Sequence, residues 1–159
     1  MNRKSYLLFV LSFISFTMIN TGFLSAQILD GRLGLFEQNA DVGNVKIDGS
    51  AYYNVEKQEY TLQGSGKNIW FGSDEFQYLY KKIKGDFILT AQVKFVGAGV
   101  DPHRKIGWMI RQSQDSASPQ VSALLHGDGL TSLQYREKSG ADMKENQLFF
   151  MPLKCNENY

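Results

Sequence analysis

The chain alternates apolar and polar residues along much of its length, and the alternation is clearest over residues 86–96. Apolar residues recur there at every second position, with Ile88 as the exception. The residues on the apolar side are Phe87, Leu89, Ala91, Val93 and Phe95. Successive side chains of a strand point to opposite sides, so a period of two is typical of a strand with one buried face. The pattern therefore predicts a half-buried strand over residues 86–96.

Shorter runs of aromatic and β-branched residues predict further strands. They cover residues 51–55, 60–63, 76–81, 105–113, 121–126 and 130–136. A polar stretch at 56–59 and the tripeptide Gly127-Asp128-Gly129 separate successive runs and predict two hairpins. No stretch between residues 27 and 140 has apolar residues at helical spacing. The chain is therefore predicted to be all-β, an antiparallel sandwich or barrel.

The first 26 residues have the organisation of a secretory signal peptide. Arg3 and Lys4 form a basic start, residues 6–19 are mostly apolar, and residues 24–26 offer a small-residue cleavage site. A membrane anchor is the alternative, but a spanning helix needs about 20 apolar residues, and this run breaks at Asn20. We therefore expect a cleaved leader, a periplasmic or extracellular protein, and no membrane span in the mature chain.

One domain is expected after the leader, because the whole chain has 159 residues. Residues 27–43 show no clear period and are assigned as an N-terminal lead-in, residues 44–140 as the β-sandwich domain, and residues 141–159 as an aperiodic tail. Within the tail, residues 143–150 fit either a strand or a single helical turn. The single cysteine, Cys155, excludes a disulfide within the chain. In an exported protein it could pair between molecules, remain a free thiol or belong to an abnormal chain end.

Charge excludes two classes of partner. The chain carries 17 Lys plus Arg and 16 Asp plus Glu, a formal net charge of +1. Removal of the leader takes away Arg3 and Lys4 and brings the formal net charge to −1. Neither value fits a nucleic-acid-binding arm or a polybasic membrane patch. We expect no nucleic-acid partner.

Catalytic and metal-binding signals are weak. Sugar hydrolysis needs two carboxylates across a groove, but no Glu-x-Asp-x-Glu occurs, and the adjacent Asp74 and Glu75 would face opposite sides of a strand. The two histidines, His103 and His126, accompany no Gly-x-Ser-x-Gly motif and have no metal-ligand spacing. Asp128 could contribute to a loop calcium site, but the role of a turn residue is favoured. We expect no catalytic residues, no metal site and no cofactor.

Aromatic side chains point instead to binding. Their rings can stack on the apolar faces of sugars while planar polar groups hold the hydroxyls. The candidate ligand-binding residues are Trp70, Tyr78, Trp108 and Arg111. A tryptophan in a sandwich is more often a core residue than a site residue. Arg111 lies within an apolar strand, so it must find a carboxylate partner or face solvent.

Several segments follow an order that resembles a family of secreted bacterial domains with the concanavalin A-like lectin/glucanase sandwich fold. The resemblance covers about residues 38–138 and depends most on Gly-Ser-Gly-x-x-Ile-Trp at 64–70 and Gly-x-Met-Ile-Arg at 107–111. The other segments are residues 40–43, 49–53, 60–63, 74–80, 85–87 and 105–106. Such domains are often joined to a Tol-type β-propeller or to sugar-active modules.

The resemblance implies a jelly-roll sandwich and carbohydrate binding. It transfers no catalytic residue, because the acidic strand motif of the hydrolases with this fold is missing. Domains of this family usually continue with further strands beyond the point that corresponds to Tyr159. The sequence therefore predicts an incomplete sandwich, truncated at its C-terminus, that is marginally stable or associates through an open edge.

The resulting hypothesis is a non-catalytic, exported carbohydrate-binding or interaction module of concanavalin A-like fold. Two alternatives remain open at this point. One is a glycoside hydrolase-related domain without an evident acidic pair. The other is a structural or protein-interaction module of a Tol-like envelope protein. The expected partner is accordingly a carbohydrate or an envelope protein.

Overall fold

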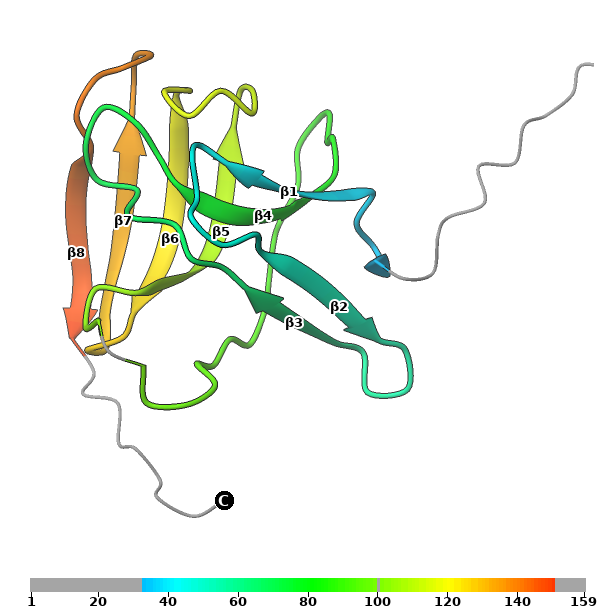
Figure 1. Ribbon diagram of the computed structural model, residues 1–159. Helices are drawn as coiled ribbons and strands as arrows, with labels where there is room; N and C mark the ends of the chain where they lie inside the picture. The colour runs from blue at the N-terminus through cyan, green and yellow to red at the C-terminus, as the bar shows by residue number, and fades with distance from the viewer. Residues whose placement is uncertain (1–32, 100, 151–159) are drawn as a thin grey trace, which may run out of the picture.

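The structure is a computed structural model that describes residues 33–99 and 101–150, and this part of the chain is all-β (Figure 1). Its strands are β1 (Gln38–Val42), β2 (Ser50–Asn54), β3 (Glu59–Gln63), β4 (Phe76–Tyr80), β5 (Lys105–Arg111), β6 (Gln120–His126), β7 (Leu130–Arg136) and β8 (Lys144–Phe150). Among the described residues, no helix is long and apolar enough to cross a membrane.

The strands form three antiparallel sheets. β1 pairs with β4, β2 pairs with β3, and the largest sheet has the order β5-β6-β7-β8. In Figure 1 the β1–β4 pair lies across the four-stranded sheet, and the β2–β3 hairpin projects to one side. The Tyr78 hydroxyl of β4 donates a hydrogen bond to the Met109 carbonyl of β5 at 3.1 Å, which ties the two layers together. This arrangement is consistent with a β-sandwich.

Both predicted hairpins are confirmed. Asn54 pairs with Glu59 across the β2–β3 turn, and the Asn54 side chain accepts hydrogen bonds from the backbone N–H groups of Glu56 and Lys57 at 3.0 Å. β6 and β7 flank the Gly-Asp-Gly tip, where the Asp128 carboxylate accepts a hydrogen bond from the Leu130 N–H at 3.0 Å. Asp128 therefore has the turn role expected of it.

The strand predicted over residues 86–96 is wrong as a paired element. Among the described residues, no strand is hydrogen-bonded to this segment. Its side chains still alternate in part, since Leu89, Val93 and Phe95 are half-buried, whereas Ile88 is 94% exposed. The alternation in sequence arises because one side of the segment packs against the protein. A β-ladder also needs a neighbouring strand, and the described part of the chain has no such strand beside this segment.

Two strands lie where no period was recognised. β1 falls within residues 27–43, which the sequence analysis assigned to a lead-in, and β8 falls within the segment assigned to an aperiodic tail. Residues 144–150 are a strand and not a helical turn. Both elements pair with strands that were recognised, β1 with β4 and β8 with β7.

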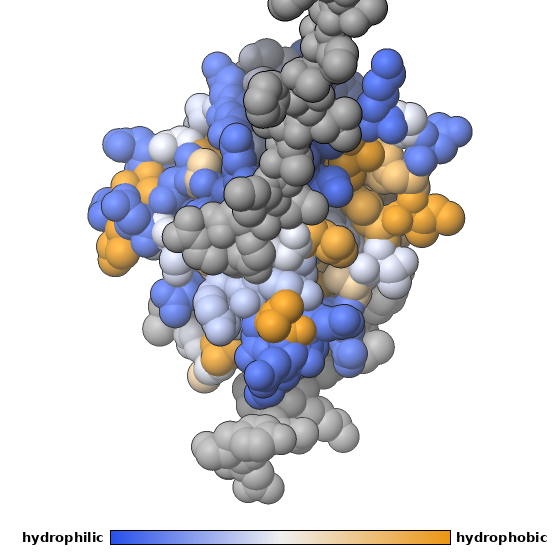
Figure 2. Space-filling model, turned by 90° about the vertical axis from the view of Figure 1, so that its right-hand side faces the viewer, coloured by the Kyte–Doolittle hydropathy of each residue, from blue (hydrophilic) through white to orange (hydrophobic). Residues whose placement is uncertain are grey.

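The four-stranded sheet buries its polar face. The buried side chains on β6 and β7 include Gln120, Ser122, His126, Ser132, Gln134 and Arg136, with Leu124 among them. The opposite face is more apolar and less covered, since Val121 is 37% exposed and Ile110 of β5 is 45% exposed. On the side of the molecule seen in Figure 2, hydrophobic side chains form several separate patches among hydrophilic ones. An antiparallel sheet with one exposed face commonly buries its apolar side chains and exposes its polar ones, and this sheet does the reverse.

Asp74 joins the layers on the polar face. Its side chain is fully buried and forms a two-pronged ion pair with Arg136 of β7, at 2.6 Å and 2.9 Å. Arg111 of β5 reaches the same carboxylate at 3.3 Å. Of the two alternatives that the sequence left for Arg111, a carboxylate partner or solvent, the structure shows the carboxylate partner. The remaining guanidinium donors of Arg136 bind the carbonyls of Ala141, Ser118 and Phe71.

Replacement of Asp74 by alanine should strongly destabilise the fold. It leaves two buried guanidinium groups without their anion, a change that typically costs about 3–5 kcal/mol. Chemical denaturation of Asp74→Ala and the wild type measures the loss. Glu137→Ala is the control, because it breaks the exposed Glu137–Lys144 pair and should leave the denaturation midpoint almost unchanged. Equal midpoints for Asp74→Ala and Glu137→Ala would contradict the structural role of Asp74.

Candidate functional site

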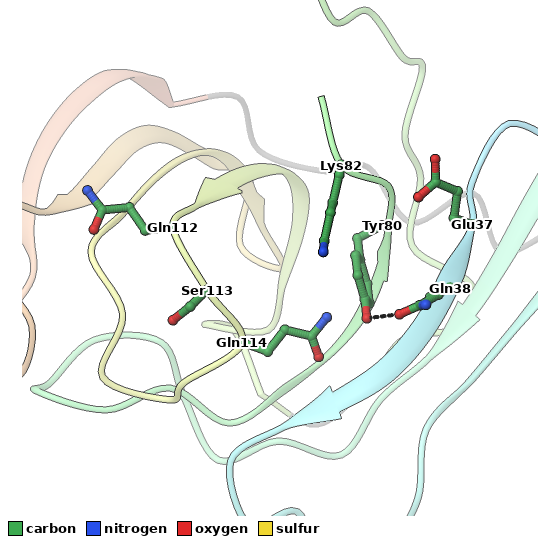
Figure 3. Close-up of a pocket in the computed structure, with 7 residues that line it drawn as sticks. All are labelled: Glu37, Gln38, Tyr80, Lys82, Gln112, Ser113 and Gln114. Carbon is green, nitrogen blue, oxygen red and sulfur yellow. Dashed lines mark hydrogen bonds between the residues drawn. The ribbon is translucent and has the colours of Figure 1, made fainter. Parts of the chain in front are cut away.

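An open polar cleft lies between the β1–β4 pair and the loop after β5 (Figure 3). Its volume is about 370 Å³. It is lined by Glu37, Gln38, Tyr80, Lys82, Gln112, Ser113 and Gln114. All of these residues except Tyr80 are exposed, so a soluble ligand can reach the cleft without any movement of the chain.

Tyr80 supplies the aromatic surface of the cleft and is held from two sides. Its ring stacks on Tyr78, with 5.1 Å between ring centroids and an interplanar angle of 13°. Its hydroxyl donates a hydrogen bond to the Gln38 side chain on the paired strand. The strand period of two puts Tyr78 and Tyr80 on one face of β4. The orientation of the Tyr80 ring is therefore fixed before any ligand arrives.

Arg111 shapes the opposite wall. Its Nε donates a hydrogen bond to the Ser113 carbonyl at 2.6 Å, and its Nη2 donates to the Asp115 carbonyl. These bonds curl the loop that carries Gln112, Ser113 and Gln114. Since Asp74 in turn holds Arg111, the buried ion pair positions one wall of the cleft.

The cleft combines several kinds of hydrogen-bonding group. In Figure 3 the Lys82 ammonium and the Gln114 amide both point toward the space beside the Tyr80 ring, whereas the Gln112 side chain points away. Amides offer donors and acceptors, Lys82 offers donors, and Glu37 offers acceptors. Among the described residues that line the cleft, Glu37 is the one carboxylate. This set can hold hydroxyl groups beside a ring but contains no facing pair of acids.

The structure does not bring the four candidate residues of the sequence analysis into one site. Tyr78 and Arg111 support the cleft from behind, through Tyr80 and through the Gln112–Gln114 loop. Trp70 lies elsewhere, with the Lys105 ammonium 5.6 Å from its ring centroid. Trp108 lines a second cavity, of about 240 Å³, on the apolar face of the large sheet.

The residues that line the cleft were not singled out from the sequence. Tyr80 could have been recognised as a candidate, because it lies two residues after Tyr78 in the predicted strand 76–81 and therefore on the same face. Gln38, Lys82 and Gln114 come from three segments that are distant in the chain and meet only through the β1–β4 ladder and the Arg111 loop. No local pattern marks such residues.

A second polar cluster is centred on His126, whose ring centroid lies 6.3 Å from that of His103. The His126 residue is only 3% exposed, and its Nε2 is 3.2 Å from the Gln134 amide nitrogen. That amide nitrogen also donates hydrogen bonds to Glu145 at 2.7 Å and to the Ser132 hydroxyl at 3.2 Å. Within the described chain, His126 Nδ1 and Gln134 Oε1 have no hydrogen-bond partner.

Burial sets the protonation of this cluster. It lowers the pKa of His126, and the nearby Lys105 ammonium lowers it further. Burial also lowers the pKa of Lys105 itself. For Glu145, burial raises the pKa, but hydrogen bonds from Gln134 and Gln147 outweigh it and bring the pKa below its usual value. Burial and the Lys105 ammonium therefore both favour the neutral form of His126.

The comparisons with known proteins leave the chain without an assigned family: no protein-family model, no curated protein and no solved structure matches it.

Acidification should destabilise the fold through His126. Its folded-state pKa lies below the unfolded value of about 6.5, so below that pH the unfolded chain binds more protons and stability falls. Melting temperatures measured between pH 7.5 and pH 5 should decline less for His126→Gln than for the wild type. His103→Gln, which changes the exposed histidine, serves as the control. If the melting temperature of His126→Gln falls with pH as steeply as that of the wild type, His126 does not change its protonation on unfolding.

Proposed function

We propose that the chain is an exported, non-catalytic carbohydrate-binding module with a concanavalin A-like sandwich, and that the Tyr80 cleft holds the sugar. The observation that carries this proposal is the placement of one fixed aromatic ring beside exposed amide, ammonium and carboxylate groups. Export rests on the leader-like residues 1–26, and the fold family rests on the resemblance over residues 38–138.

The chemistry of the cleft suits a sugar better than an apolar ligand. A sugar has an apolar face of C–H groups and a rim of hydroxyls, each of which donates and accepts hydrogen bonds. The ring of Tyr80 can stack on the C–H face of the sugar. The side chains of Gln38, Gln114 and Glu37 offer acceptors for its hydroxyl groups. Tyr80 is held by its stack on Tyr78 and its bond to Gln38, so binding immobilises few additional groups.

A hydrolytic role is the less favoured alternative. Retaining and inverting glycosidases both use two carboxyl groups that flank the scissile bond. Within the described lining of the cleft, Glu37 has no second carboxylate facing it. A protein-interaction role is the second candidate, and the exposed apolar face of the large sheet favours it.

Tyr80→Ala should reduce glycan binding roughly tenfold, since the stacking surface is lost. A glycan array identifies the ligand, and isothermal titration with that ligand gives the affinities. Tyr80→Phe should bind almost as well as the wild type, because the ring remains. Tyr52→Ala is the matched control, as Tyr52 is a 63% exposed tyrosine on the projecting hairpin.

The outcomes separate the candidate functions. Loss of binding in Tyr80→Ala but not in Tyr52→Ala, Trp70→Ala or Trp108→Ala supports the cleft. Loss in Trp70→Ala or Trp108→Ala alone places the ligand elsewhere and overturns the cleft assignment. No binding to any glycan by a protein that melts cooperatively favours the interaction role. Sugar cleavage that Glu37→Gln abolishes favours the hydrolase.

A further inference from the structure

Residues 86–96 have the pattern of a strand but no paired strand in the described part of the chain. Among the described residues, none forms a backbone hydrogen bond with residues 81–99. Figure 1 shows this stretch as a long trace that leaves the end of β4 and passes down the molecule to the loop before β5. Unpaired N–H and C=O groups along such a stretch form a template for another strand.

The apolar side of this segment lies against the large sheet. Phe87 and Leu89 share a cavity of about 240 Å³ with Trp108, Ile110, Val121, Ala123 and Leu133. Further along, the Arg104 guanidinium covers the Phe95 ring at 4.6 Å. The segment is thus a lone element over the sheet's apolar face, and it leaves Ile110 and Val121 partly exposed. A second strand beside it would extend the cover.

We propose that two copies of the chain pair through residues 86–96, as antiparallel strands about a twofold axis at Thr90. This pairing satisfies backbone groups on one edge of each segment. It also joins two lone segments into a two-stranded layer, whose apolar side covers the apolar faces of the two large sheets. The proposal concerns a surface separate from the Tyr80 cleft and does not depend on sugar binding.

The sequence of the segment is complementary to itself in this register. With the axis at Thr90, Asp86 of each copy lies opposite Lys94 of the other, so two oppositely charged pairs form. Phe87 lies opposite Val93, and Leu89 opposite Ala91, so the apolar side chains face one another on the buried side.

Neighbouring registers lose this match. With the axis at Leu89, Lys84 lies opposite Lys94, and two like charges meet. With the axis at Ala91, Lys94 lies opposite Ile88 and Asp86 opposite Val96, so neither charge has a partner. Charge complementarity therefore selects the Thr90 register and a second copy of this chain as the occupant.

Charge reversal tests the register. Sedimentation equilibrium of the full-length gene product, as purified from expressing cells, should show a monomer–dimer equilibrium at micromolar concentrations. Asp86→Lys creates two like-charge pairs and should weaken the dimer about tenfold, and the double change Asp86→Lys with Lys94→Asp should restore it. Asp48→Lys, an equal charge change at an exposed site far along the chain, should leave the dimer intact.

A cysteine at the axis tests the geometry independently. In a Cys155→Ser background, Thr90→Cys places two thiols opposite each other, so mild oxidation should give a covalent dimer. Gln92→Cys faces the same side but lies opposite Ile88, and it should cross-link poorly. A monomer at all concentrations, a dimer indifferent to charge reversal, or equal cross-linking through Gln92→Cys would overturn the proposal. A stable complex with a different protein, formed by a chain that stays monomeric alone, would also overturn it.

Discussion

The buried ion pair between Asp74 and Arg136 is the constraint on which the rest of the structure depends. It joins the loop before β4 to the end of β7 in the large sheet, and Arg111 extends it to β5. Two guanidinium groups share one carboxylate, and carbonyl oxygens of three loops, those of Ser113, Ala141 and Phe71 among them, complete their hydrogen bonding. Removing the anion would leave buried positive charge without compensation, which is why the loops and the sheet must form together.

The Asp74 cluster also explains why the large sheet buries its polar face and not its apolar face. Burial of a sheet face with arginine and glutamine requires hydrogen-bond partners for the polar groups. Asp74 and the Phe71 carbonyl supply them for Arg136, and Ser132 and Glu145 supply them for the Gln134 amide nitrogen. In the described part of the chain, the apolar face is covered only by residues 86–96 and by Phe36, whose ring centroid lies 6.3 Å from that of Trp108. Because the Asp74 cluster buries the polar face of the large sheet, that face supports the wall of the Tyr80 cleft. For the same reason the apolar face of the sheet stays partly exposed and available to a partner.

The sequence predicted what depends on neighbouring residues. The β2–β3 and β6–β7 hairpins follow from their turns. The apolar neighbours of Arg111 predicted either a carboxylate partner or a solvent-facing side chain, and the partner is Asp74. The cleft could not be predicted, because Gln38, Lys82 and Gln114 meet only through long-range pairing. β1 has no clear alternation and is a strand because β4 lies beside it. Residues 86–96 are the opposite case: they alternate strongly, but in the described part of the chain no strand pairs with them.

Hydrogen exchange of the native protein tests the central role of the Asp74 cluster most directly. The N–H groups of Asp74, Gly140 and Met143 donate to the Ser116, Ala117 and Trp70 carbonyls around this cluster. If the cluster holds the fold together, these loop amides should exchange only through global unfolding, with the same protection as the central amides of β6 and β7. Exchange of these three amides at the rate of exposed loop amides would contradict the account.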